Sequence, residues 1–171
     1  LSMRVVVSFY TTENLNELRH HWEFSSALQS KGILGTDEVF SKKISLGGLM
    51  VELDWGEKAI TIVNKKHLVR PSGFDYDSCK KIFFVASLDG NFIYVLNEKF
   101  REIERISNKL MNDIHSVSLN NTRDKLLVAS TGIDAIMEID LRGAITWLWL
   151  ASENGFNINP LGESVKINTD K

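Results

Sequence analysis

Short apolar segments bounded by turn-forming residues recur along the chain with a fixed spacing. Lys81-Ile-Phe-Phe-Val-Ala-Ser87 aligns without a gap on Asp124-Lys-Leu-Leu-Val-Ala-Ser130, 43 residues later. The same spacing places Phe92–Asn97 on Ala135–Asp140, and one step back it reaches Leu49–Asp54. A fixed period of this length indicates a repeat architecture. Three copies are visible, and the first is eroded.

Each of the two clear copies contains four segments that predict β-strands, because they are rich in Val, Ile, Phe and Tyr and end in turn residues. Asp89-Gly90 falls between two of them, where a tight turn needs residues that tolerate positive φ. The second copy predicts strands at Ser72–Tyr76, Ile82–Ser87, Phe92–Leu96 and Glu102–Ile106. The third predicts strands at Ile114–Leu119, Lys125–Ser130, Ala135–Ile139 and Ile145–Leu150.

Four short antiparallel strands in meander order, repeated at this period, are typical of β-propeller blades. We therefore predict an all-β chain that forms a partial β-propeller of four-stranded antiparallel blades with a 43-residue repeat. The single propeller segment 1–171 divides into an N-terminal strand and linker, an eroded blade, two whole blades and the start of a further blade, at 1–23, 24–66, 67–109, 110–152 and 153–171.

The chain is too short to close the usual ring, because propellers have 4–8 blades. Open blade faces would expose apolar surface, so we expect completion from outside the segment. One alternative is a second copy, which gives a six-bladed ring with two-fold symmetry. A second is a different chain that supplies the other half. A third, disfavoured because a strand is missing, joins Arg4–Tyr10 to the C-terminal strands as a fourth blade.

The composition and charge of the chain limit the classes of molecule that it is expected to bind and the compartment in which it is expected to occur. The net charge of −2 and the absence of a Lys/Arg run favour neither nucleic acid nor an anionic membrane. No apolar stretch has the length of a membrane helix, and the first residues do not resemble a signal peptide. Cys79 is the only cysteine, so an internal disulfide is excluded. These features predict a cytoplasmic protein.

The candidate chemistry lies where the first strand of each blade lines the central channel. Arg70-Pro-Ser72 and Asp113-Ile-His115 occupy equivalent positions in the repeat. Asp113 and His115 are two residues apart, so on a strand they share one face. His115 is the candidate base or nucleophile, oriented by Asp113, and Arg70 and Ser72 are candidate substrate-binding residues.

Two other interpretations of these residues stay open. Asp113 and His115 supply two ligands for a divalent metal, which is fewer than the three or more that zinc usually takes from protein. Alternatively, they satisfy backbone groups at the start of a strand, and Arg70 forms an ion pair at the rim. Trp147 and Trp149 share one face of an outer strand, which favours blade packing or a subunit interface.

The third copy resembles a blade of the arylsulfotransferase-type propellers and of the related NHL-repeat type. The resemblance rests on Asp113-Ile-His-Ser-Val-Ser-Leu119, Lys125-Leu-Leu-Val-Ala-Ser130, Ile136-Met-Glu-Ile-Asp140 and Ile145-Thr-Trp-Leu-Trp149. The resemblance as a whole covers about two blades of the chain. In arylsulfotransferases a channel histidine accepts the sulfuryl group, and the resemblance implies this role for His115.

Two functions follow as hypotheses. In the first, the chain is a propeller-type enzyme, or half of one, that acts on a small organic molecule in the channel by group transfer through His115. In the second, it is a non-catalytic propeller module that binds a protein or small ligand and is completed by dimerisation or a partner chain. The first predicts that His115→Ala abolishes turnover and leaves assembly intact. The second predicts that changes at Trp147 and Trp149 disrupt binding.

Overall fold

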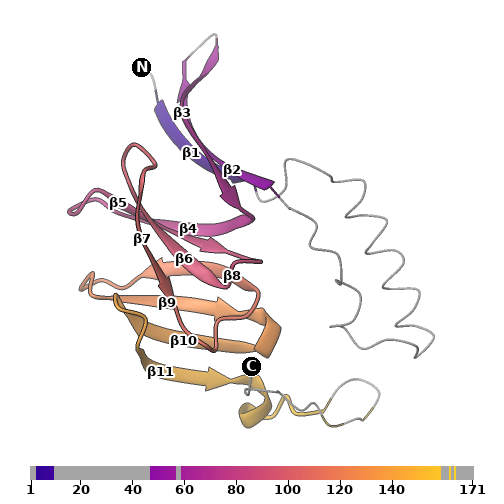
Figure 1. Cartoon of the computed structure of the whole chain (residues 1–171). Helices are drawn as coiled ribbons and strands as arrows, with labels where there is room; N and C mark the ends of the chain where they lie inside the picture. Colours follow the sequence, from indigo (N-terminus) through magenta and orange to yellow (C-terminus); the bar gives the residue numbers. More distant parts are fainter. Residues whose placement is uncertain (1–2, 10–46, 57–58, 159–161, 163, 165–171) are drawn as a thin grey trace.

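The computed structural model describes residues 3–9, 47–56, 59–158, 162 and 164. Its strands form three antiparallel sheets, which follow one another along the molecule (Figure 1). The prediction of an all-β partial propeller is confirmed. Within these residues no helix is long and apolar enough to span a membrane.

Blade 1 is the three-stranded sheet, in the order β1 (Met3–Phe9), β2 (Gly47–Trp55) and β3 (Ile60–Val69). Because β2 carries the residues equivalent to the third strand of blade 2, β1 takes the second-strand position beside it. The described part of the predicted strand Arg4–Tyr10 therefore pairs with β2 and not with C-terminal strands, and the third completion alternative is wrong. The predicted eroded blade began at residue 24, and its part up to residue 46 lies outside the described residues.

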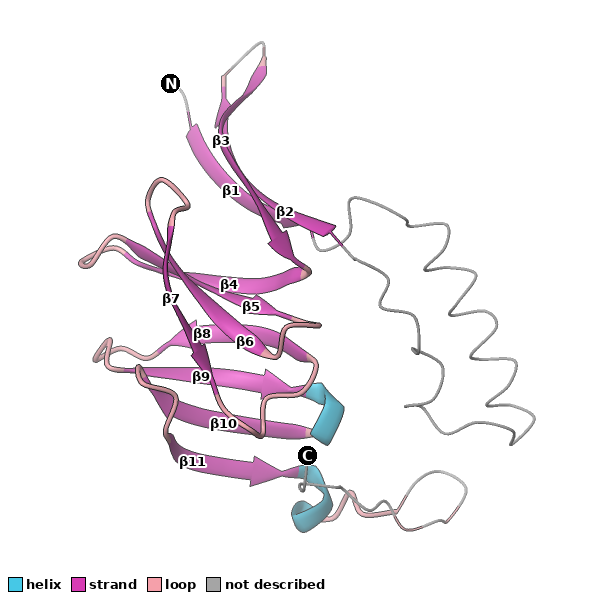
Figure 2. Ribbon diagram, in the orientation of Figure 1, coloured by secondary structure: helices cyan, strands magenta, loops and turns pink. Residues whose placement is uncertain are grey.

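Blades 2 and 3 are the two four-stranded sheets. Blade 2 contains β4 (Pro71–Asp77), β5 (Ile82–Ser87), β6 (Phe92–Asn97) and β7 (Glu102–Ser107). Blade 3 contains β8 (Ile114–Leu119), β9 (Lys125–Ser130), β10 (Ala135–Asp140) and β11 (Ile145–Leu150). Two short 3₁₀ helices follow β9 and β11, η1 (Thr131–Ile133) and η2 (Ala151–Asn154), as Figure 2 shows.

The repeat extends to side-chain hydrogen bonds in the turns. The Asn97 carboxamide oxygen accepts from the backbone N–H groups of Lys99 and Arg101, at 2.9 and 3.0 Å. Asp140, 43 residues later, accepts in the same way from the N–H groups of residues 142 and 144, both at 2.9 Å. Side chains that cap turns in this way explain why an Asx residue ends the third strand of blades 2 and 3.

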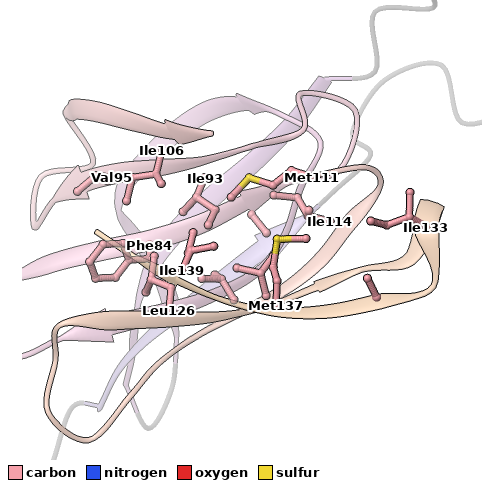
Figure 3. Close-up of a cluster of buried hydrophobic side chains, with 14 residues drawn as sticks. Phe84, Ile93, Val95, Ile106, Met111, Ile114, Leu126, Ile133, Met137 and Ile139 are labelled. Carbon is pink, nitrogen blue, oxygen red and sulfur yellow. The ribbon is translucent and has the colours of Figure 1, made fainter. Parts of the chain in front are cut away.

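A buried core joins blades 2 and 3 (Figure 3). The face of the blade 2 sheet that points toward blade 3 packs on the face of blade 3 that points toward blade 2, so the two sheets bury each other. The contributing residues of blade 2 are Phe84, Ala86, Ile93, Val95 and Ile106, and those on the strands of blade 3 include Leu126, Val128, Met137 and Ile139. A second core joins blade 2 to blade 1, with Phe83, Val85, Tyr94, Leu96 and Phe100 packed with Met50 and Leu68.

Candidate functional site

At Gly73 the backbone of the inner strand β4 lies directly against the backbone of the inner strand β8, with no side chain between them. A Cβ atom placed on Gly73 would lie 2.9 Å from both the His115 carbonyl oxygen and the Ser116 Cα. Because these are backbone atoms, they cannot move aside as a side chain can, and only glycine fits here. The approach brings Ser72 and His115, which are repeat equivalents, to neighbouring strands.

His115 lies in β8 with an exposed side chain. The register between β8 and β9 shifts between Ile114 and Ser116, so His115 occupies a β-bulge. The equivalent stretch of β4 shows the same irregularity, between Pro71 and Phe74. Bulges redirect a side chain and are common near functional sites. The His115 imidazole is therefore accessible to a molecule in solution, as the group-transfer hypothesis requires.

Asp113 lies just before β8, and its φ of 47° puts it in the left-handed region. Its repeat equivalent Arg70 has a φ of 33°, so the same unusual backbone precedes the inner strand in both blades. The alternation argument that put Asp113 and His115 on one face applies to strand residues and does not apply to Asp113. The Asp113 N–H donates to the Asn91 side-chain oxygen at 2.9 Å, which ties the residue to blade 2.

Arg70 is nearly buried, with 11% of its side chain exposed, and pairs with Asp89 at 2.5 Å. Burial raises the pKa of the Asp89 carboxyl and outweighs the opposing effect of Arg70, and the Asp113 carboxylate raises it further. Arg70, Asp89 and Asp113 are therefore coupled electrostatically at one end of the blades. The Arg70 charge already has a carboxylate partner, with which any anionic substrate would compete.

The Ser72 hydroxyl joins the two inner strands. It donates to the Ile114 carbonyl at 2.9 Å and lies 3.3 Å from the Ala86 carbonyl, while the Ser72 carbonyl accepts from Ser8 at 2.7 Å. These contacts connect β4 to both neighbouring blades. They give Ser72 a structural task that the sequence did not predict.

Among the residues that the structure describes, no group of three or more His, Cys, Asp and Glu side chains is placed to hold a metal ion. Asp113 and His115 thus have no third ligand of these types in the described part of the chain. Two protein ligands are fewer than a zinc site usually has.

The sequence did not single out the outward face of blade 3, apart from its two tryptophans. Leu127 and Ile136 lie on this face and are 47% and 39% exposed. Their repeat equivalents Phe84 and Ile93 are 1% and 0% exposed, because blade 3 covers them. Trp147 lies on the same face, paired across the strands with Glu138, and is 50% exposed. A comparison of burial between residues 43 positions apart identifies this face, because equivalent residues are buried in blade 2 and exposed in blade 3.

A polar cluster also lies on this open face. Lys125 and Glu138 form an ion pair at 2.6 Å, and the Thr146 hydroxyl donates to the same carboxylate oxygen at 2.6 Å. The hydrogen bond from Lys125 lowers the pKa of Glu138 and keeps it ionised. The face therefore combines apolar residues with one neutralised charge pair, as interfaces between proteins do.

The outward face of blade 1 is also apolar. Val51 and Leu53 alternate along β2 with Met50, which packs toward blade 2, so they point the other way. Val51 is itself buried, at 2% exposed, and Leu53 is partly buried, so the exposed part of this face lies toward the end of β2. Leu53 pairs with Ile62 on β3, and Ile62 is 63% exposed. Trp55, one pleat further along, is 50% exposed. The outward face of blade 1 thus exposes apolar residues around Ile62 and Trp55, and the register places the exposed polar residues Lys65 and His67 on the same face.

No family model matches the chain, and no curated protein is similar to it. Solved structures do match part of it. Hydrazine synthase of Kuenenia stuttgartiensis is 14% identical with a TM-score of 0.49, and the match covers 62% of this chain and 33% of that one. A functionally unknown protein of Desulfotomaculum acetoxidans is 13% identical, with a TM-score of 0.44, over 59% of this chain and 37% of that one. The periplasmic gluconolactonase PpgL of Pseudomonas aeruginosa is 12% identical, with a TM-score of 0.48, over 60% of this chain and 35% of that one. The matched part thus spans about a third of each of these chains.

Proposed function

We propose that the protein is a propeller module that binds another polypeptide through the open face of blade 3. The observation that carries the proposal is the contrast between equivalent positions: Leu127 and Ile136 are exposed where Phe84 and Ile93 are buried. An apolar sheet face of this kind marks an interaction site. The protein would act by recognition and assembly, without a chemical step.

The energetics favour a bound state. Burying a large apolar side chain that is otherwise in water contributes about 1.5–3 kcal/mol. Leu127, Ile136 and Trp147 are each about half exposed, so covering them stabilises a complex by a few kcal/mol before the cost of association. Tryptophan is also enriched among residues that dominate binding energy. Trp147 is therefore the anchor that we expect to matter most.

The charge pair on this face would set specificity. A partner that covers Glu138 and Lys125 must leave their mutual hydrogen bond intact or replace it, because an unpaired buried charge is costly. This requirement disfavours a purely apolar partner. It favours a surface with a matching polar group opposite Thr146 and Glu138.

The test places a photoreactive benzoylphenylalanine at residue 147 and cross-links the protein in the cells in which it occurs. Position 103 is the matched control, because Ile103 is an equally exposed apolar residue on an outer strand but belongs to blade 2. Mass spectrometry then identifies any polypeptide attached. An adduct at 147 without one at 103 supports the proposal. No adduct at 147, or the same adducts at both positions, overturns it.

Group transfer in the channel is the second candidate, and the exposure of His115 in an inner-strand bulge favours it. In the arylsulfotransferase-like form, a sulfate ester would lose its sulfuryl group to the His115 ring nitrogen as the sulfur–oxygen bond breaks. A nitrogen–sulfur bond would form and the alcohol or phenol of the donor would leave with the electrons of the broken bond. An acceptor hydroxyl would then attack the sulfur, break the nitrogen–sulfur bond and give its proton to the released imidazole. Asp113 would orient the ring, and Arg70 and Ser72 would hold the anion, although both have other partners.

The assay for this candidate uses an aryl sulfate as donor and a phenol as acceptor. Turnover by the unaltered protein that is lost in His115→Gln supports group transfer. Equal turnover by both proteins, or none by either, removes it. The same assay in the presence and absence of a chelator tests the divalent metal that Asp113 and His115 would share.

A further inference from the structure

We infer that the polypeptide bound by blade 3 is a second copy of this chain, and that two copies form a six-bladed ring. In this ring, blade 3 of each copy packs on blade 1 of the other. The inference rests on the proposed binding role of the blade 3 face. Three blades fill half of a six-bladed ring, and six lies within the usual range of propellers. A two-fold axis then generates both interfaces and closes the assembly.

The outward face of blade 1 matches the face by which blade 3 packs on blade 2. Leu53 and Ile139 are repeat equivalents, two periods apart. Leu53 pairs across the sheet with Ile62, as Ile139 pairs with Ile145. Ile139 is buried in the core between blades 2 and 3, and Ile145 packs against that core. Blade 1 therefore presents apolar residues where blade 3 uses them to cover its neighbour. The register places the exposed polar residues Lys65 and His67 on the same face, so the partner surface is not purely apolar.

The opposite half of the interface is the outward face of blade 3. Its residues Leu127, Ile136 and Trp149 are the equivalents of Phe84, Ile93 and Ile106, all buried in the core between blades 2 and 3. One chain thus carries both halves of a blade-to-blade contact, one at each end. Neither half has a described partner blade within the chain. A second copy supplies both missing halves at once, so the new contacts continue the packing already present between blades 2 and 3.

The alternative of a two-fold contact between two blade 3 faces fits less well. It would bring the Glu138 and Lys125 pairs of both copies together and would leave the apolar face of blade 1 uncovered. Ile62 and Trp55 would then stay in water in the assembled protein. Ring closure covers both faces of both copies.

The experiment begins with the purified chain carrying Cys79→Ser, which removes its one exposed native thiol. One preparation also carries Trp147→Cys and another Ile62→Cys, both at exposed positions. Each preparation is treated with a short bismaleimide alone and after the two are mixed. The ring predicts a cross-linked dimer in the mixture and little in either preparation alone. A control mixture replaces Ile62→Cys by Ile103→Cys and should not cross-link.

Each outcome decides the inference. A dimer by sedimentation, together with a cross-link only in the 147–62 mixture, supports the ring. Cross-linking of Trp147→Cys with itself shows face-to-face pairing and overturns it. A monomer also overturns it, and if residue 147 still cross-links to a different protein in cells, the proposed binding function stands without it. Circular dichroism of each variant verifies that the blades are folded.

Discussion

Ser130 is the hydroxyl whose removal best tests how the inner strands are held in place. Its side chain is fully buried at the end of β9. The hydroxyl oxygen lies 2.9 Å from the carbonyl oxygens of Leu110 and Asn112 and accepts from the Asn112 N–H at 2.9 Å. It thereby fixes the segment that leads through Asp113 into β8. Ser130→Ala removes all of these contacts and changes the volume little.

The magnitude follows from which backbone groups lose their partner. The Asn112 carbonyl keeps a hydrogen bond from the Gly132 N–H, at 3.0 Å, so it stays satisfied. The Asn112 N–H loses its side-chain acceptor, and the Leu110 carbonyl loses its donor. Leaving a buried polar group unsatisfied costs about 1–3 kcal/mol. We therefore expect Ser130→Ala to lower the free energy of unfolding by about 2 kcal/mol.

The repeat provides a second site and a control. Ser87, 43 residues earlier, is equally buried, lies 2.7 Å from the Val69 carbonyl oxygen and accepts from the Gly90 N–H at 3.2 Å. Ser87→Ala should therefore have a similar cost. Ser116→Ala, at an exposed position on β8, should stay within about 0.5 kcal/mol of the parent protein. Urea unfolding measures all three, with unchanged slope. If Ser130→Ala is as mild as Ser116→Ala, these hydroxyls do not hold the inner strands.

Four further results are expected. Phe84→Ala should lower the free energy of unfolding by about 3–5 kcal/mol in urea unfolding, whereas Leu127→Ala at the equivalent exposed position should weaken association, measured by sedimentation. Gly73→Val should lower the free energy of unfolding by about 1–3 kcal/mol or more in urea unfolding, since the new side chain meets the backbone of β8. For Asp77, burial raises its pKa, but hydrogen bonds from the Lys80 N–H, the Arg123 guanidinium and the Cys79 N–H lower it overall. Its contribution is present at neutral pH and lost as the pH falls through the lowered pKa, so the parent should lose more stability than Asp77→Asn below about pH 4 in urea unfolding at several pH values. His115→Gln should leave the sedimentation of the assembly unchanged; a change there would place His115 in the interface.

The repeat made the strands of blades 2 and 3 predictable, because identical spacing of apolar runs and turn residues leaves little choice of pairing. The predicted strand Ile82–Ser87 is β5 as found, and the predicted Ala135–Ile139 falls one residue short of β10. The place of β1 was not predictable. Arg4–Tyr10 reads as a strand, but its partner depends on a contact across more than forty residues that no local pattern encodes.

The candidate site was less predictable, for a backbone reason. Alternation along a strand holds only where the strand is regular. The left-handed residue Asp113 and the bulge at His115 both interrupt it. Nor does sequence indicate that Ser72 donates to the Ile114 carbonyl or that Arg70 pairs with Asp89. The first contact joins two blades and forms only when they pack, and the second joins two loops of blade 2 that are distant in sequence.

The differences between copies carry more functional information than their similarity. Three positions change from apolar to polar together between blade 2 and blade 3, where Ile82, Val95 and Ile103 become Lys125, Glu138 and Thr146. In blade 3 these three side chains contact one another in one cluster. A blade face destined for permanent burial gains nothing from a charge pair, because desolvation offsets the attraction. On a face that is exposed before assembly, the charge pair increases solubility. The apolar residues on the same face, Leu127, Ile136 and Trp147, remain available to contact a partner. The polar cluster therefore distinguishes the face that receives a separate polypeptide from the face that blade 3 covers during folding.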